Sequence, residues 1–447
     1  MSVARTIQLT AVLLGTLVAV AACEHAPDSV ASSGEPASGR FQIAMIPDTQ
    51  NYVDYTHQRA TGFAIDASEQ FIAQMEWIAQ RGRASGGDIA FVAAVGDVWQ
   101  HQTQAVEPGH EQRGLGRLEK SFFGDHFAPT PQTLEVEIPK AIEGYEKIHA
   151  AGIPFGVAPG NHDYDAMWNI VGFPPNFSKK PSELTMTPED IGMLHIGGLD
   201  NFRSVFGDGG RFFAGKDWYV SSFRGGANSA QIFEAGGYRF LHLTFEMAAD
   251  DEVLAWAQGV IDAHPGLPTI LSTHDYLDGR GRRRANPIID LPRADPDHHN
   301  DADAIFAKWV APNDQIFLVL CGHHHGQAHR IDRNAAGHAV IQMLADYQDR
   351  GQSGLDAGQP LGGMQGGPVG IGDGWFRLLE FDLGSDRPKL TVRTYSTHYN
   401  VYSGDLDTYA EWYREHEQPD MTDAEFHAAE AFVLELDDFR ARFGAPL

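Results

Sequence analysis

Cysteine is scarce in this sequence, because the chain of 447 residues contains only Cys23 and Cys321. Two cysteines cannot form the dense disulfide framework that stabilises many small secreted domains. If Cys23 carries a lipid, no intramolecular disulfide is possible, and the stability of the fold has to come from a hydrophobic core. The sequence is 43% hydrophobic and 11% aromatic, which is enough for such a core and excludes disorder of the whole chain.

Basic residues are also few, since 33 Lys and Arg stand against 60 Asp and Glu, for a formal net charge of -27. This balance argues against nucleic acid as a partner, because phosphate backbones are bound by a surplus of Lys and Arg. A small anionic substrate remains compatible with it, because bound cations can dominate the field inside a site. The sequence has no internal repeat, and no Ser or Cys stands in a nucleophile motif.

The first residues read "MSVARTIQLTAVLLGTLVAVAAC", with one Arg before an apolar run that ends in small residues. This pattern predicts an export signal over residues 1–22. The segment "VAAC" resembles a bacterial lipobox, which implies a lipidated Cys23 followed by a flexible tether over residues 23–39. We therefore expect an exported lipoprotein, in the periplasm or on the outer membrane, that meets the membrane only through this lipid. Ordinary secretion and a retained anchor are the alternatives.

From Arg40 onward the sequence alternates between short apolar strands and amphipathic helices. The strands "FQIAMI", "DIAFVAAV" and "IPFGVA" are separated by helical periodicity around residues 71–79 and 139–151, which is typical of crossover units in a buried sheet. Irregular stretches at about 100–136 and 164–228 read as loop insertions. After these stretches the sequence predicts regular secondary structure again, beginning with a hairpin that has Gly236 and Gly237 at its turn. Strands such as "PTILSTHD", "QIFLVLC" and "AVIQML" follow.

The end of the sequence reads as a helical extension over residues 404–447. "TDAEFHAAEAFVLELDDFRARF" predicts one amphipathic helix that begins at a capping box formed by Thr422 and Glu425. The preceding region, residues 40–403, is expected to form the main folded domain.

Five of the predicted strands end in side chains that bind metals. In chain order these side chains belong to Asp48, Gln50, Asp97, Asn161, His162, Asp163, His274, His323 and His325. Ligands bind at the carboxyl ends of strands in open α/β sheets. Carboxylate, amide and imidazole groups are donors that Mn, Fe and Zn accept, and side chains two positions apart on an extended segment project to the same side. The pattern therefore predicts a metal site, although each residue alone is more simply a capping or polar side chain.

The ordered motifs "DTQ", "GDVW", "GNHD", "THD" and "GHHH" span residues 48–325. In this order they resemble the motifs of the calcineurin-like metallophosphoesterases. The resemblance implies an α/β fold, a four-layer α/β/β/α sandwich of two mixed sheets flanked by helices. It also implies two metal ions, Mn, Fe or Zn, and hydrolysis of small phosphomonoesters or phosphodiesters by a hydroxide that both metals activate.

The resemblance further implies a role for each matching residue. The first metal takes Asp48, Gln50 and His325, the second takes Asn161, His274 and His323, and Asp97 bridges both. His162 is expected to assist the leaving group without binding metal, and Asp163 to orient it. His324, between two ligands, is expected to point the other way.

Two positions depart from the usual family pattern. Gln50 replaces the commoner histidine, and an amide oxygen is a weaker donor than imidazole, so the first metal is expected to be bound more loosely or to be of another kind. Val98 and Trp99 follow Asp97 where purple acid phosphatases have a tyrosine, which indicates a non-purple branch.

Other polar groups allow two interpretations. Arg280 and Arg282, in "GRGRRR", either contact the substrate phosphate or lie in a solvated loop. The "DPDHH" cluster at 295–299 is either a surface loop or an additional cation site. Nothing in the sequence shows whether loop histidines such as His101 or His110 reach the metal site. A non-catalytic lipoprotein and a metal hydrolase acting on a non-phosphate ester or amide are the rival functions.

Overall fold

A computed structural model describes residues 39–54, 58–102, 132–165, 198–286, 289–363 and 366–446. These ranges belong to one compact unit, Pro36–Leu447. The predicted export signal, Cys23 and nearly all of the tether lie outside the described residues. So do residues 103–131 and 166–197, which make up most of the first predicted insertion and half of the second. Within the described ranges no helix combines the length and the apolar character that a membrane span needs.

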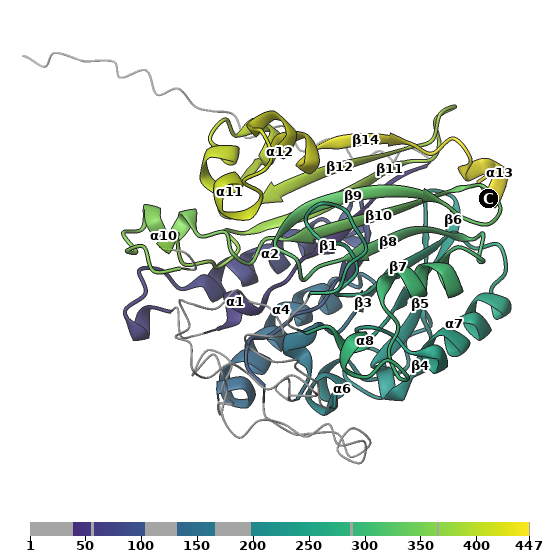
Figure 1. The fold of residues 1–447 in the computed structure, drawn as a ribbon, viewed down its shortest axis with the longest axis horizontal. Helices are drawn as coiled ribbons and strands as arrows, with labels where there is room; N and C mark the ends of the chain where they lie inside the picture. The colour runs from purple at the N-terminus through teal and green to yellow at the C-terminus, as the bar shows by residue number, and fades with distance from the viewer. Residues whose placement is uncertain are drawn as a thin grey trace, which may run out of the picture. The chain divides into compact units, whose positions relative to one another are not determined.

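Two mixed sheets form the centre of this unit, and each has seven strands among the described residues (Figure 1). The strands of the first sheet are β1 (Arg40–Ile46), β2 (Ile89–Ala94), β3 (Phe155–Val157), β11 (Trp375–Asp382), β12 (Lys389–Ser396), β13 (Val401–Tyr402) and β14 (Phe432–Glu435). Their order is β13-β12-β11-β1-β2-β3, and β14 also pairs with β12.

The second sheet has the order β4-β5-β6-β7-β8-β10-β9. Its strands are β4 (Tyr219–Phe223), β5 (Asn228–Ala235), β6 (Tyr238–Thr244), β7 (Thr269–Ser272), β8 (Ile316–Cys321), β9 (Gly326–Arg333) and β10 (Ala339–Asp346). The turn predicted at Gly236 and Gly237 is confirmed, because Ala235 pairs with Tyr238 across it. β1, β2 and β3 run parallel in the first sheet, and β6, β7, β8 and β10 run parallel in the second, so the carboxyl ends of the parallel strands of each sheet lie at a common edge.

Helices cover the outer faces of the two sheets. α2 (Ala67–Gln80) and α4 (Ile138–Ala150) pack on the first sheet through Phe71, Met75 and Ile148, all fully buried. α7 (Asp251–Ala263) and α9 (Ala302–Ile305) pack on the second. The other helices are α1 (Gln50–Val53), α6 (Asp200–Phe206), α8 (Leu291–Ala294), α10 (Gln352–Asp356), α11 (Tyr409–Glu417), α12 (Asp423–Glu430) and α13 (Phe439–Phe443).

The core between the sheets is rich in stacked aromatic rings. Phe91 of the first sheet stacks on Phe233 of the second with ring centroids 4.4 Å apart, and Phe41 lies 5.3 Å from Phe240. The Phe91–Phe233 pair is stacked and the Phe41–Phe240 pair is tilted, and aromatic pairs of both kinds stabilise a core beyond the area that they bury. The four-layer α/β/β/α sandwich that the sequence predicted is therefore confirmed.

The single helix predicted over residues 422–443 is wrong. The capping box is present, with Thr422 Oγ1 accepting from the backbone N–H of Glu425, but α12 ends at Glu430. β14 follows and pairs with β12, with Leu434 opposite Leu390. Phe432 and Val433 have high β propensity. Pairing with β12 also satisfies backbone groups of that strand that would otherwise be free, and this pairing cannot be foreseen from the helical periodicity of the sequence.

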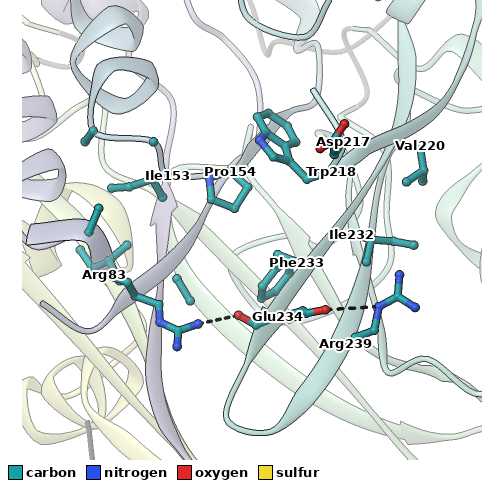
Figure 2. A pocket seen from close by; sticks show the side chains of 15 residues that line it. Arg83, Ile153, Pro154, Asp217, Trp218, Val220, Ile232, Phe233, Glu234 and Arg239 are labelled. Carbon is teal, nitrogen blue, oxygen red and sulfur yellow. Dashed lines mark hydrogen bonds and ion pairs between the residues drawn. The ribbon is translucent and has the colours of Figure 1, made fainter. Parts of the chain in front are cut away.

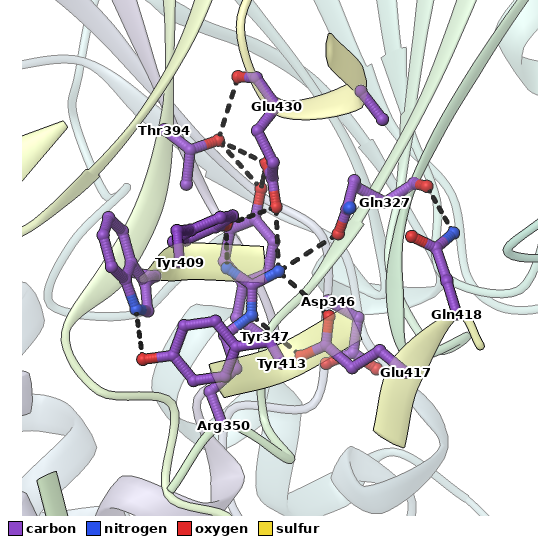
Figure 3. Close-up of polar contacts among 12 residues, drawn as sticks. Gln327, Asp346, Tyr347, Arg350, Thr394, Tyr409, Tyr413, Glu417, Gln418 and Glu430 are labelled. Atoms are coloured by element: carbon purple, nitrogen blue, oxygen red, sulfur yellow. Dashed lines mark hydrogen bonds and ion pairs between the residues drawn. The ribbon is translucent and has the colours of Figure 1, made fainter. Parts of the chain in front are cut away.

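Arg350 joins the end of the chain to the sheets through a buried cluster of charges (Figure 3). Its guanidinium group donates to Glu417 of α11 at 2.8 and 3.0 Å and to Glu430 of α12 at 2.8 Å. It also lies over the ring of Tyr347, 4.0 Å from the centroid. Because Arg350 is 1% exposed, these carboxylates are needed to balance its charge.

Candidate metal centre

The structure brings most of the predicted ligands together at the carboxyl ends of the strands. His274, after β7, has its Nε2 atom 3.2 Å from Asp97 Oδ1, 3.0 Å from Asn161 Oδ1 and 4.0 Å from Asp48 Oδ2. Donor atoms of Asp97, His274 and His323 all lie within 4.8 Å of one another. Residues separated by up to 275 positions in the chain therefore share one buried cluster.

The backbone is strained at two of these residues. Asp97 has a φ of 50° and His323 a φ of 73°, in the left-handed region that non-glycine residues rarely occupy. Glycines allow the chain to come close beside them. A Cβ on Gly160 would lie 2.2 Å from Asp97 Oδ1, and one on Gly322 would lie 2.1 Å from Asp48 Oδ1. Strain of this kind is concentrated at functional sites.

Hydrogen bonding fixes the orientation of His274. Its Nδ1–H donates to the backbone carbonyl of Val95 at 2.7 Å, which leaves Nε2 facing the carboxylates. Burial lowers the pKa of His274, but the charges of Asp97 and Asp48 outweigh burial and raise it to about 10. The carboxylates that attract a proton to His274 Nε2 would attract a metal cation to the same place.

Burial and mutual repulsion raise the energy of the carboxylates. Burial, followed by the charge of Asp346, raises the pKa of Asp48 well above its usual range. Burial also raises the pKa of Asp97, but His274 and His162 have the larger combined effect and lower it. Clustered buried carboxylates are stabilised by cations, because a bound cation offsets both desolvation and repulsion.

Several donor atoms in the cluster lack a hydrogen-bond partner among the described residues. They are Asp48 Oδ1, Gln50 Oε1 and both ring nitrogens of His323. Burial lowers the pKa of His323 well below its usual range, so the ring is neutral and able to act as a ligand. Buried polar atoms without a partner are uncommon, and a missing ion is one explanation for them. The residues present therefore fit a metal centre.

The half-site predicted for the first metal is more open. Gln50 Nε2 lies 3.1 Å from Asp97 Oδ2, whereas His274 faces the other oxygen of this carboxylate, Oδ1. His325 is about one third exposed, and its Nδ1 lies 2.5 Å from Asp349 Oδ2. Its Nε2 is 2.9 Å from the side-chain nitrogen of Gln348, which also contacts Gln50. Gln348 belongs to no sequence motif, so the sequence alone does not indicate that it lies at this site.

His162 lies at the edge of the cluster, with Nε2 4.0 Å from Asp97 Oδ2. Its Nδ1–H donates to the backbone carbonyl of Gln100 at 2.6 Å. The backbone N–H groups of Gln100 and His101 both donate to Glu137 Oε2, at 3.1 and 3.0 Å, and His101 Nδ1 lies 2.6 Å from Glu137 Oε1. Glu137 is fully buried and clamps the segment that holds His162. Glu137 belongs to no sequence motif, and nothing in the sequence distinguishes His101 from the other loop histidines.

Asp163 braces the loop that carries His162. Its carboxylate accepts from the backbone N–H groups of Val98 at 2.9 Å and Gly160 at 2.8 Å. Burial and the neighbouring Asp97 raise its pKa to about 8, while these two hydrogen bonds lower it. Asp163 thus influences the position of the His162 ring through the backbone on which the ring is carried.

The remaining predicted site residues have partners of their own. Arg280 pairs with Asp420, and Arg282 pairs with Asp278 at 2.6 Å, so contact of either with a substrate stays a prediction. His324 Nε2 lies 3.1 Å from Asp275 Oδ1. In the "DPDHH" cluster, His298 pairs with Asp295 at 2.9 Å. Of the loop histidines, His110 lies outside the described residues.

A separate hollow of about 450 Å³ lies at the opposite ends of the strands (Figure 2). Ile89, at the start of β2, and Pro154, just before β3, line it together with Trp218 and Phe233. Its polar rim includes Arg83, which donates to the backbone carbonyl of Glu234 at 2.7 Å. Because ligands of open α/β sheets bind at carboxyl ends, this hollow is not the candidate site.

Comparison with known proteins agrees with this geometry. The family model for calcineurin-like phosphoesterases matches residues 43–327, more than half of the chain. The chain is also 25% identical over 386 residues to the "Uncharacterized protein YvnB" of Bacillus subtilis (strain 168), a match that covers 84% of this chain and 21% of that relative. The chain therefore spans about a fifth of the relative's length. The match to the family model shows that this chain belongs to the calcineurin-like phosphoesterase family, a family of metal-dependent phosphoesterases.

Proposed function

We propose that the chain binds two divalent or trivalent cations at the strand ends and hydrolyses small phosphomonoesters or phosphodiesters outside the cytoplasm. One observation carries the proposal, namely the arrangement around Asp97. Its Oδ1 lies 3.2 Å from His274 Nε2, and its Oδ2 lies 3.1 Å from Gln50 Nε2. A carboxylate whose two oxygens face different ligand sets is placed to bridge two cations.

The proposed ligands divide into two half-sites around Asp97. Asp48, Gln50 and His325 form the first half-site, and Asn161, His274 and His323 form the second. Cations held by these residues would supply positive charge to the phosphoryl oxygens and would lower the pKa of a bound water. Mn, Fe or Zn suits these oxygen and imidazole donors.

The protein's own contribution to the reaction comes from His162. Its Nδ1–H is held by the Gln100 carbonyl at 2.6 Å, so Nε2 is the nitrogen that faces the cluster. In its protonated form the ring can donate from Nε2 to the leaving oxygen while Nδ1–H keeps its bond to Gln100. Such proton transfer typically accelerates a reaction by about 10² to 10⁴-fold.

The test of the proposed activity is a substrate panel. Full-length protein is stripped of metal and assayed on chromogenic phosphomonoesters, phosphodiesters and carboxylic esters after adding back Mn, Zn, Fe or Ca. The proposal expects metal-dependent turnover of phosphoric esters that vanadate or phosphate inhibits. Turnover of carboxylic esters alone, without such inhibition, would instead identify a hydrolase of another class.

Export and lipid attachment are a separate part of the proposal, supported by the apolar N-terminal run and the "VAAC" segment. The measurement is labelling with a fatty acid in a bacterial host, followed by membrane fractionation. Label on the wild-type chain and none on Cys23→Ser supports a lipoprotein. Equal labelling of both chains, or none on either, contradicts lipid attachment at Cys23.

A further inference from the structure

The strand β10 ends beside β8, the strand that carries two of the proposed ligands. The two strands are parallel, and Leu344 of β10 is paired with Cys321 of β8. The segment after β10 therefore emerges next to the segment that contains His323 and His325. Its residues Asp346–Arg350 lie outside the family match, which ends at residue 327.

Within this segment, the side chain of Gln348 lies between two proposed ligands of the first half-site. Its nitrogen is 2.9 Å from His325 Nε2, and its oxygen accepts a hydrogen bond from Gln50 Nε2. Asp346, fully buried, fixes the residue by accepting from the Gln348 backbone N–H at 3.0 Å and from its side chain at 3.1 Å. Gln348 Oε1 and Asp97 Oδ2 both accept from Gln50 Nε2, while Gln50 Oε1 has no partner among the described residues. Rotation of the Gln50 amide by 180° exchanges its oxygen and nitrogen, which would gather three oxygens where a cation can bind and would leave the bond between Gln348 and Asp346 intact.

We propose that Gln348 is a further ligand of the first metal, and that the segment Asp346–Arg350 completes the first half-site. This inference rests on the proposed two-metal function. It gives this half-site four oxygen donors, from Asp48, Gln50, Asp97 and Gln348, beside one imidazole. An oxygen-rich set suits Mn²⁺ better than a set dominated by imidazole, and it compensates for the weaker donor at Gln50.

The neighbours of Gln348 hold the half-site in place. Asp349 Oδ2 lies 2.5 Å from His325 Nδ1, which directs His325 Nε2 towards the cluster, as carboxylates do for many metal-binding histidines. Arg350 is fixed by Glu417 and Glu430 from the end of the chain (Figure 3). The two C-terminal helices that carry these glutamates therefore act on the metal centre as positioning elements.

The test measures Mn²⁺ binding to stripped full-length protein by calorimetry and by electron paramagnetic resonance. Gln348→Ala is expected to weaken one of the two Mn²⁺ sites by about 10- to 100-fold and to leave the other unchanged. Gln348→Glu, which keeps the volume and an oxygen donor, is expected to restore that site. Gln352→Ala is the matched control, because Gln352 lies in α10 and its side chain bonds to Asp356 at 2.8 Å.

Wild-type affinity at both sites in Gln348→Ala overturns the assignment. If Gln348→Ala loses Mn²⁺ affinity at one site and Gln348→Glu does not restore it, the assignment of Gln348 as a ligand is also overturned, because a structural defect then explains the loss of affinity. Wild-type protein that binds no pair of Mn, Zn or Fe ions refutes the proposed function itself, so the two failures are distinguishable.

Discussion

Replacement of Glu430 by Gln is predicted to destabilise the protein by about 3 to 5 kcal/mol, because it leaves buried positive charge without its counter-charge. The side chain of Glu430 is fully buried, and its carboxylate accepts from Arg350 at 2.8 Å and from Arg377 at 3.0 Å. It also accepts from the hydroxyl groups of Tyr347 at 2.8 Å, Thr394 at 2.6 Å and Tyr409 at 2.5 Å. Glutamine preserves the volume but supplies neither the charge nor the second acceptor.

The pH dependence gives an independent measure of the same interaction. Burial raises the pKa of Glu430, but Arg350 and Arg377 outweigh it and lower the pKa from 4.5 to about 2. The folded protein thus binds this proton less readily than the unfolded chain. Its stabilising contribution is complete above about pH 4.5 and is lost as the pH falls through about 2. The difference between these two pKa values corresponds to roughly 3 kcal/mol.

The assay is urea unfolding of the full-length chain, followed by circular dichroism near pH 7 and at intervals down to about pH 3. Glu425→Gln in the same helix is the control, and its midpoint is expected to stay close to wild type, since glutamine can also serve in a capping box. Free energies of unfolding for Glu430→Gln within about 1 kcal/mol of wild type near neutral pH would refute the reasoning. So would a difference that does not shrink towards low pH.

Three further predictions concern the metal centre. His162→Ala should retain both cations by metal analysis yet lose about 10² to 10⁴-fold in turnover; unchanged turnover removes His162 from the reaction. Asp97→Ala should abolish paired Mn²⁺ binding in calorimetry, and two bound ions in this variant would contradict its bridging role. Glu137→Gln should slow esters with poor leaving groups more than nitrophenyl esters, because it loosens the segment that holds His162; equal losses on both would indicate a general structural defect.

The sequence predicted the parts of this fold that depend on short stretches of the chain. Short continuous apolar runs indicated β1, β2, β3, β7 and β8, and the polar residue after each run, such as Asp97, marked the strand end. Parallel strands bring their carboxyl ends together, so the nearness of Asp48 and Asp97 followed from strand direction within the first sheet. His274, in contrast, follows a strand of the second sheet and joins them through the packing of the two sheets.

Other features depend on contacts that the local sequence does not contain. The pairing of β14 depends on the free edge of β12, so helical periodicity wrongly continued α12 to residue 443. The burial of Arg350 is not evident from the local sequence, because its partner Glu430 lies 80 positions away. Gln348 belongs to no motif, and only the strand order β8-β10 places it beside His325.

The most direct test of the two-metal account is anomalous X-ray scattering from crystals of the full-length chain grown with Mn²⁺. The account predicts two peaks about 3.5 to 4 Å apart, with the Asp97 carboxylate between them. A single peak, or a pair of peaks that Asp97 does not contact, would contradict it.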